Sequence, residues 1–144
     1  MEETTKKLKK SLRVKARKEA QKAQVGGPST ASLRNFRGSA RKTRLVADLV
    51  RGKKVDEALF ILRYSNKRVS SDLEKLLLSA INNWEAKNEG ASVEDSALYV
   101  KRISVDDGRI LRRMRPAAQG RGHIIRKRTN HVTVIIDSLK NGIN

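Results

Sequence analysis

Arginine side chains crowd one short stretch of this 144-residue sequence, between residues 105 and 131. A guanidinium group carries N–H donors in a planar fork that matches the oxygens of a phosphate, so such a cluster suits the binding of a polyanion. The candidate contacts in this stretch are Arg112, Arg113, Arg115, Arg121, Arg126, Lys127 and Arg128, here called the arm cations. Their type and spacing predict electrostatic recognition of nucleic-acid phosphates.

The same stretch has the pattern of a long β-hairpin arm. Segments that contain apolar residues flank a centre with Pro116, Gly120 and Gly122, which favour a sharp turn. Between Arg112 and Gly122 the only large apolar side chain is Met114, so the arm needs an external partner to order it. A solvated basic loop is the alternative, and the β-compatible flanks favour the arm. The predicted tip comprises Met114, Pro116, Ala117, Ala118, Gln119, Gly120, Gly122 and His123.

The charge balance points to the same class of partner. The chain has 33 Lys and Arg against 15 Asp and Glu, a formal net charge of +18. Residues 1–24 hold nine basic and three acidic groups, and residues 101–128 hold ten and two. The middle, residues 29–100, holds thirteen and nine and is typical of a folded body. A nucleic-acid binder uses such an excess to displace counterions from phosphates.

Patterns for catalysis or metal binding are missing from the sequence. It has no cysteine, so there is no thiolate nucleophile and no Cys-based zinc site. Cationic neighbours of His123 and His131 disfavour a bound metal, so structural or RNA-contacting roles are expected. Asp106 and Asp107 are expected to form a turn or to pair with arginines. We expect no enzyme activity, cofactor, metal or small-molecule substrate.

The apolar and aromatic residues further limit the location of the protein and the kind of partner it binds. No apolar run approaches the roughly 20 residues of a membrane span, and the start lacks the apolar stretch of a signal peptide. These features predict a cytoplasmic protein with no membrane partner. Only five aromatic residues occur, which argues against stacking of single-stranded bases and favours structured RNA or duplex DNA.

A short extended segment and a helix are predicted before the arm. Residues 31–37 form the extended segment around Leu33, and Gly38 and Ser39 then predict a turn and a helix N-cap. The helix ends at Gly52. Its predicted buried face comprises Leu45, Val46, Leu49 and Val50.

Two more helices are predicted next. The second starts near Val55 and ends at residues 64–66, with Phe60 near the core. The third opens with a capping box at residues 71–74 (SDLE) and runs to about Lys87. Its core stripe comprises Leu73, Leu76, Leu77, Ala80, Ile81 and Trp84.

Strand patterns complete the predicted domain. Apolar residues alternate with polar ones in residues 98–105, but the pair Leu98 and Val100 is out of phase by one residue with the pair Ile103 and Val105. This shift predicts a β-bulge near Lys101 or Arg102. Val132, Val134 and Ile136 alternate on the return strand. The predicted fold is α+β, with three helices packed on a small antiparallel sheet, a protruding β-hairpin arm and a basic N-terminal tail.

Two regions are predicted from these patterns. Residues 1–30 are predicted to form a basic flexible extension, and residues 31–144 a globular domain that binds RNA or DNA and includes the arm at about 105–131. The candidate contacts on the body are Arg34, Arg37, Arg41, Lys42, Arg44, Arg51, Lys53 and Lys54. Arg44 and Arg51 are the least specific of these, because a helical arginine can equally form a solvated face.

Several blocks of sequence resemble a known family. They are residues 39–53 (SARKTRLVADLVRGK), 78–83 (LSAINN), 105–108 (VDDG), 120–121 (GR) and 126–134 (RKRTNHVTV). On these blocks the chain resembles, over about residues 31–137, the bacterial form of the L twenty-two family of large-ribosomal-subunit proteins. The family tip usually reads Pro-Arg-Ala-x-Gly-Arg-Ala, often with Lys at x. Residues 116–122 here read PAAQGRG, so cationic contacts are not carried over to Ala117 and Gln119.

The resemblance implies a definite function. It implies a three-helix, small-sheet body that binds large-subunit ribosomal RNA, and a hairpin whose tip helps to line the nascent-peptide exit tunnel. It also implies an early role in subunit assembly and proximity to the macrolide-antibiotic site. The implied partners are large-subunit rRNA, neighbouring ribosomal proteins and the nascent peptide.

Other function classes predict different features. An architectural DNA-binding protein that uses the arm as a basic β-ribbon is the main alternative, although the tip lacks the apolar wedge that such proteins insert between bases. A membrane-surface protein would need bulky apolar residues on an amphipathic helix, which residues 1–24 lack. An RNA-modifying enzyme would need a catalytic constellation.

Overall fold

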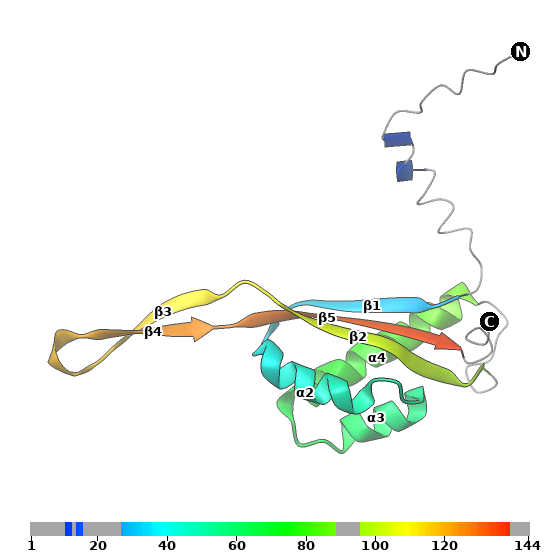
Figure 1. Ribbon diagram of the computed structural model, residues 1–144, viewed down its shortest axis with the longest axis horizontal. Coiled ribbons are helices and arrows are strands. Elements are labelled where there is room, and N and C mark those ends of the chain that lie inside the picture. The colour runs from blue at the N-terminus through cyan, green and yellow to red at the C-terminus, as the bar shows by residue number, and fades with distance from the viewer. Residues whose placement is uncertain (1–10, 13, 16–26, 89–95, 139–144) are drawn as a thin grey trace, which may run out of the picture.

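The structure is a computed structural model of the chain, and it describes residues 11–12, 14–15, 27–88 and 96–138. Three helices cover one face of an antiparallel sheet, and a long hairpin arm extends beyond the end of that sheet (Figure 1). The predicted α+β fold with three helices is therefore confirmed. Most of the predicted basic extension lies outside the described residues.

Two sheets are formed by the described strands. The strands are β1 (Ser29–Arg37), β2 (Leu98–Asp107), β3 (Leu111–Pro116), β4 (Gly122–Lys127) and β5 (Thr129–Ser138). The body sheet has the order β1-β5-β2, and both of its pairings are antiparallel. β3 and β4 form a separate two-stranded sheet, the arm, which continues the direction of β2 and β5 (Figure 1).

The helices bury apolar stripes against this sheet. They are α2 (Ala40–Val50), α3 (Val55–Arg63) and α4 (Arg68–Lys87). α4 packs on β1 and β5, whereas α2 and α3 contact β2. From the sheet, Val132, Val134 and Ile136 point into the core, because alternate residues of a strand share one face. The predicted stripe of α4 is confirmed, with Trp84 fully buried and Ile81 packed at the edge of the core.

The predicted buried face of α2 is partly wrong. Val46 and Val50 are buried, but Leu45 is 64% exposed and Leu49 is also exposed. Adjacent helical residues are about 100° apart, so only one member of each apolar pair can face the sheet. The remaining buried positions of α2 are Ala40, Thr43 and Ala47, which are small enough to admit a close approach to the sheet.

Two further predictions about the helices are wrong. The capping box does not start α4, because the helix begins at Arg68 and the Ser71 hydroxyl donates to the Arg68 carbonyl at 3.3 Å. Ser70, which lies upstream of the predicted start, is a buried residue of this helix. Phe60 does not lie near the core and is 61% exposed, since α3 buries Val55, Ala58 and Leu62 instead.

Irregularities in the sheet bring polar groups together. The predicted bulge is confirmed by a shift in the β2–β5 register between Val100 and Arg102. The Lys101 ammonium donates to the buried Asp137 carboxylate at 2.7 Å, and this hydrogen bond raises the pKa of Lys101 above its ordinary value. A lysine whose pKa is raised by folding stabilises the folded state at every pH below its unfolded-state pKa. This contribution to the free energy of unfolding is therefore complete at neutral pH and is lost only in strong alkali, as the pH rises through the folded-state pKa.

Candidate nucleic-acid interface

Like charges face each other across the arm. β3 and β4 pair along their whole length, which places Arg112 directly opposite Arg126. Basic residues directly opposite in an antiparallel sheet repel each other. Among the described residues, none of the arm cations forms an ion pair with a carboxylate. The arm is therefore an unneutralised cationic ribbon that a polyanion would stabilise.

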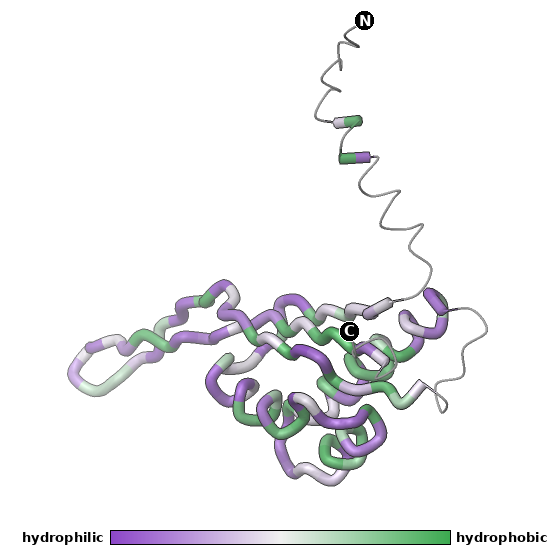
Figure 2. Tube along the Cα trace, turned by 45° about the vertical axis from the view of Figure 1, so that its right-hand side comes forward, coloured by the Kyte–Doolittle hydropathy of each residue, from purple (hydrophilic) through white to green (hydrophobic). Residues whose placement is uncertain are grey.

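The arm has two chemically different faces near its tip. Arg113 and Arg115 point to one face, because residues two apart in a strand share a side. Met114 lies opposite Ile124 on the other face, and both side chains are exposed. Figure 2 shows hydrophilic and hydrophobic segments alternating along the arm. Near the tip, one face thus carries Arg115, and the other carries the Met114–Ile124 pair with Arg112 and Arg126 further from the tip on the same face.

A tight turn closes the arm. The Ala117 amide donates to the Arg121 carbonyl at 2.8 Å, and a short 3-10 turn, Ala118–Gly120, lies between them. Gln119 and Gly120 both have positive φ, of 61° and 70°. The glycine adopts this conformation without a Cβ penalty, as the sequence predicts, whereas the glutamine is an unpredicted case. The turn leaves only small side chains beside Gln119 at the tip.

A cationic cleft lies where the arm meets the body. This junction cleft has a volume of ≈ 590 Å³. Its basic lining residues come from β1, α4, β3, β4 and the link to β5, and they are Arg37, Arg68, Arg113, Arg126, Lys127 and Arg128. The rest of the lining comes from Leu111 of β3, Thr129 of β5 and the turn before α2, Gly38 and Ser39. Five of these six basic residues were predicted from the sequence as contacts, and the structure brings them together.

Arg68 is a residue of the junction cleft that was not predicted from the sequence as a contact. It is the first residue of α4, which the capping-box prediction placed three residues further along the chain. If the helix began at residue 71, Arg68 would lie in the loop before it, and the sequence predicts no contact between that loop and the other basic residues. An arginine immediately before an amphipathic stripe was the available signal. In the structure this residue lies on the rim of the junction cleft.

Two of the predicted body contacts are engaged inside the protein. The Arg44 guanidinium donates to the Val105 carbonyl at 2.9 and 3.1 Å and forms a 3.3 Å ion pair with Asp107. Arg51 donates to the Ile103 carbonyl at 3.3 Å and pairs with a carboxylate of its own helix. Both side chains therefore brace α2 against β2. The expected pairing of Asp107 with an arginine is confirmed.

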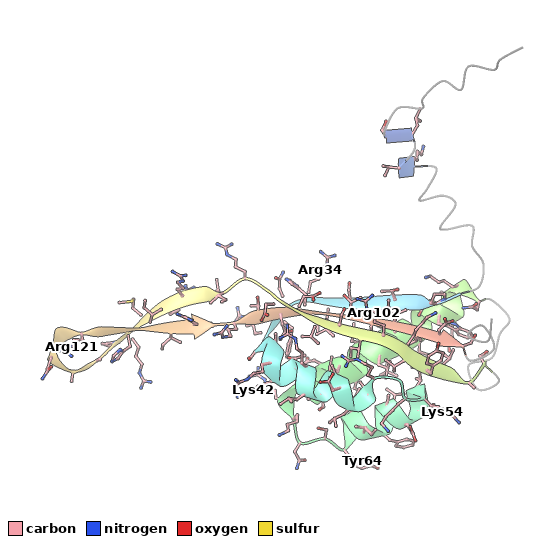
Figure 3. All side chains as sticks on the ribbon, in the orientation of Figure 1. Arg34, Lys42, Lys54, Tyr64, Arg102 and Arg121 are labelled. Atoms are coloured by element: carbon pink, nitrogen blue, oxygen red, sulfur yellow. The ribbon has the colours of Figure 1, made fainter. Side chains whose placement is uncertain are left out.

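The remaining body contacts do not form one cluster. Arg41 and Lys42 are exposed on α2, and Lys54 is exposed at the start of α3. Arg34 lies on the sheet face opposite the helices, beside a ≈ 240 Å³ groove, and Figure 3 shows it on the other side of the molecule from Lys42. Lys53 forms a 3.8 Å ion pair with a carboxylate one turn along α3. These positions surround the body and do not converge on a single patch.

The histidines have different surroundings. The Nδ1 atom of His131 accepts a 3.1 Å hydrogen bond from the Asn35 amide, at the irregular point of the β1–β5 pairing where Asn35 has a positive φ. His123 is exposed near the arm tip. In the described part of the chain, no three His, Asp or Glu side chains gather in an arrangement that could hold a metal ion. None of the described helices is long and apolar enough to span a membrane.

The cationic arm, the junction cleft and the α+β body correspond to a known family. A family model described as ribosomal protein L22p/L17e matches residues 31–137. The chain belongs to this family. The resemblance found from the sequence blocks is confirmed, and so is the expectation that the protein is structural and not an enzyme.

Curated relatives support the same assignment. The large ribosomal subunit protein uL22 of Flavobacterium johnsoniae is 57% identical over 126 residues, which cover 88% of this chain and 89% of the relative. The protein of the same name from Porphyromonas gingivalis is 53% identical and covers 90% and 92%. That of Cytophaga hutchinsonii is 51% identical over 140 residues, covering 96% of this chain and 76% of the relative. Membership of the family supports a structural role in the ribosome.

Proposed function

We propose that this protein binds the RNA of the large ribosomal subunit through its arm and junction cleft. The observation that carries the proposal is the convergence of six basic side chains around a ≈ 590 Å³ cleft. None of the six is ion-paired within the described residues, so their charge is available to phosphates. The names of the relatives point to the large subunit as the source of that RNA.

The proposed contacts form two groups. The arm contributes the arm cations, and the body contributes Arg34, Arg37, Arg41, Lys42, Lys54 and Arg68. Lys53 is a weaker contact because a carboxylate partly neutralises it. Arg44 and Arg51 instead hold the helix against the sheet. Most of these groups contact the phosphate backbone, which fixes position rather than reading sequence.

The arm tip is proposed to line the nascent-peptide exit tunnel and to support subunit assembly. The arm is a narrow two-stranded ribbon that leaves the body, which suits threading between RNA helices (Figure 1). Its tip carries small residues at 117, 118, 120 and 122, and these leave room for a passing peptide. The exposed Met114–Ile124 pair fits such a contact better than it fits phosphate. The proposal thus makes rRNA, neighbouring ribosomal proteins and the nascent peptide the partners.

Cosedimentation tests the proposed function. The full chain, added to large subunits that lack this protein, is expected to sediment with them, and a cross-linker placed at Arg113 is expected to map to large-subunit rRNA. The physical reason is the position of Arg113 on the rim of the junction cleft. A chain that stays in the supernatant would contradict the proposal, and so would cross-links from residue 113 that reach only protein.

Alanine substitutions of two neighbouring cations of α2 are expected to have different effects on RNA binding and on stability. Lys42→Ala is expected to make the salt dependence of rRNA binding shallower by about one unit of log affinity per log salt, because Lys42 is exposed and unpaired among the described residues. Arg44→Ala is expected to leave that slope unchanged and to destabilise the fold by about 1 kcal/mol, since its hydrogen bonds go to β2. Salt titrations of binding and denaturant unfolding of both variants check this pair.

The two variants control for each other, because each removes one positive charge from α2. An equal change of slope in both would show that net charge, and not the position of the side chain, decides RNA binding. Unchanged stability of Arg44→Ala would contradict the bracing role.

A further inference from the structure

A groove lies between α3 and α4, and none of its lining residues is a proposed RNA contact. It has a volume of ≈ 320 Å³. Its lining residues are Asp56, Leu59, Phe60, Arg63, Glu74 and Leu78. None of these residues lines the junction cleft. In Figure 3, Tyr64 at the end of α3 lies on the opposite side of the molecule from Arg34 of the open sheet face.

Apolar side chains form the wall of this groove. Phe60 is 61% exposed and Leu78 is also exposed, while Leu59 is half-buried and packs against the core. The three side chains meet across two helices, so they form a patch and are not scattered single residues. An apolar patch rimmed by charged residues is the kind of surface that can bind another macromolecule. A phosphate backbone gains nothing from such a surface.

Acidic residues line the same groove, although the chain as a whole carries a net charge of +18. Asp56 and Glu74 are not ion-paired with any described residue, and the rim carries only one cation, Arg63. Two free carboxylates repel phosphate and attract lysine or arginine. The charge of the groove is therefore the reverse of the charge of the junction cleft.

The geometry points to a protein occupant, and we propose that the groove docks a segment of a neighbouring protein in the large subunit. The segment presents an apolar side chain to Phe60 and Leu78, flanked by lysine or arginine that pairs with Asp56 and Glu74. This inference rests on the proposed function, because a ribosomal neighbour supplies the segment.

Photo-cross-linking from the groove tests the inference. The probe is the full chain with Phe60→p-benzoylphenylalanine, assembled into large subunits and irradiated. The matched control carries the same substitution at Leu45, which is 64% exposed on α2 and lies outside the groove. We expect residue 60 to cross-link to one ribosomal protein, at a segment rich in lysine or arginine, and residue 45 not to cross-link to that segment.

Charge reversal in the groove supplies a second measurement. Asp56→Lys together with Glu74→Lys is expected to lower the yield of the cross-link from residue 60 by roughly tenfold, because the rim would then repel the basic segment. Both residues are at least partly exposed, so the variant is expected to fold. An unchanged yield would overturn the charge pairing on which the choice of occupant depends.

The remaining outcomes separate the two proposals. Cross-links from residue 60 to RNA, to residues 1–26 of the same chain, or to nothing would overturn the docking inference while cosedimentation stays intact. Cross-links from both positions to the same segment would also overturn it. If neither variant joins large subunits, the proposed function fails and the docking inference fails with it.

Discussion

Changing Arg68, Arg113 and Arg126 to alanine together is expected to lower the affinity for deproteinised large-subunit rRNA by about a hundredfold at 0.15 M salt. Each cation that neutralises a phosphate releases condensed counterions, and this release drives binding. If about eight phosphates are neutralised, the log affinity of the unaltered chain falls with log salt at a slope of roughly −6 to −7. The triple variant is expected to have a slope that is shallower by about two to three units.

Equilibrium binding across a salt series measures both quantities. Between about 50 and 200 mM salt, the unaltered chain is expected to lose about four orders of magnitude in affinity. The matched control changes Arg63, Lys75 and Lys87 to alanine, since these exposed residues of α3 and α4 lie away from the junction cleft. The control has the same net charge as the triple variant and is expected to keep most of the slope.

Three results would contradict this interpretation. A slope near zero for the unaltered chain would exclude a polyanionic partner. Equal losses in the triple variant and its control would assign binding to the overall charge and not to the junction cleft. Comparable affinity for duplex DNA in matched salt would favour the architectural DNA-binding alternative over rRNA.

Periodicity predicted the elements of the body because burial there follows chain geometry. The stripe of α4 recurs at helical spacing around Leu77 and Trp84, and both residues are in the core. The break in alternation at Lys101 likewise predicted the bulge that lets Asp137 be paired. The orientation of α2 was not predictable in this way, because residues 45–46 and 49–50 are adjacent apolar pairs and their pattern alone does not say which member faces the sheet.

The grouping of the interface residues was only partly predictable. Charge density along the chain was sufficient to predict the arm, because its cations are closely spaced in sequence and the segment has few apolar residues to bury. The junction cleft was not predictable, since it joins Arg37, Arg68 and Arg126 from distant segments, and their proximity depends on how the arm leaves the sheet. Nor could the sequence separate Arg44 from Lys42, because only the structure shows the Val105 carbonyl within reach of one of them.

Replacing residues 109–128 by Asn-Gly is expected to remove the arm without unfolding the body. The Gly108 amide already donates to the Thr129 carbonyl at 2.8 Å, so a two-residue hairpin turn can join these positions. No arm residue belongs to the hydrophobic core, and β3 and β4 pair only with each other. The free energy of unfolding is therefore expected to change by less than about 0.5 kcal/mol, while the slope of log rRNA affinity against log salt becomes shallower by about five units or more.

Denaturant unfolding, rRNA binding and the macrolide response of cells that depend on the variant measure these effects. The matched control keeps the arm but changes all the arm cations to glutamine, which separates the charge of the arm from its shape. Both variants are expected to lose most of the salt-dependent binding, but only the shortened chain removes the tip backbone that the proposal places in the tunnel. A changed macrolide response in the shortened chain alone would therefore follow from the tip. The same response in both would assign it to weakened RNA binding, and loss of cooperative unfolding would show that the arm stabilises the body.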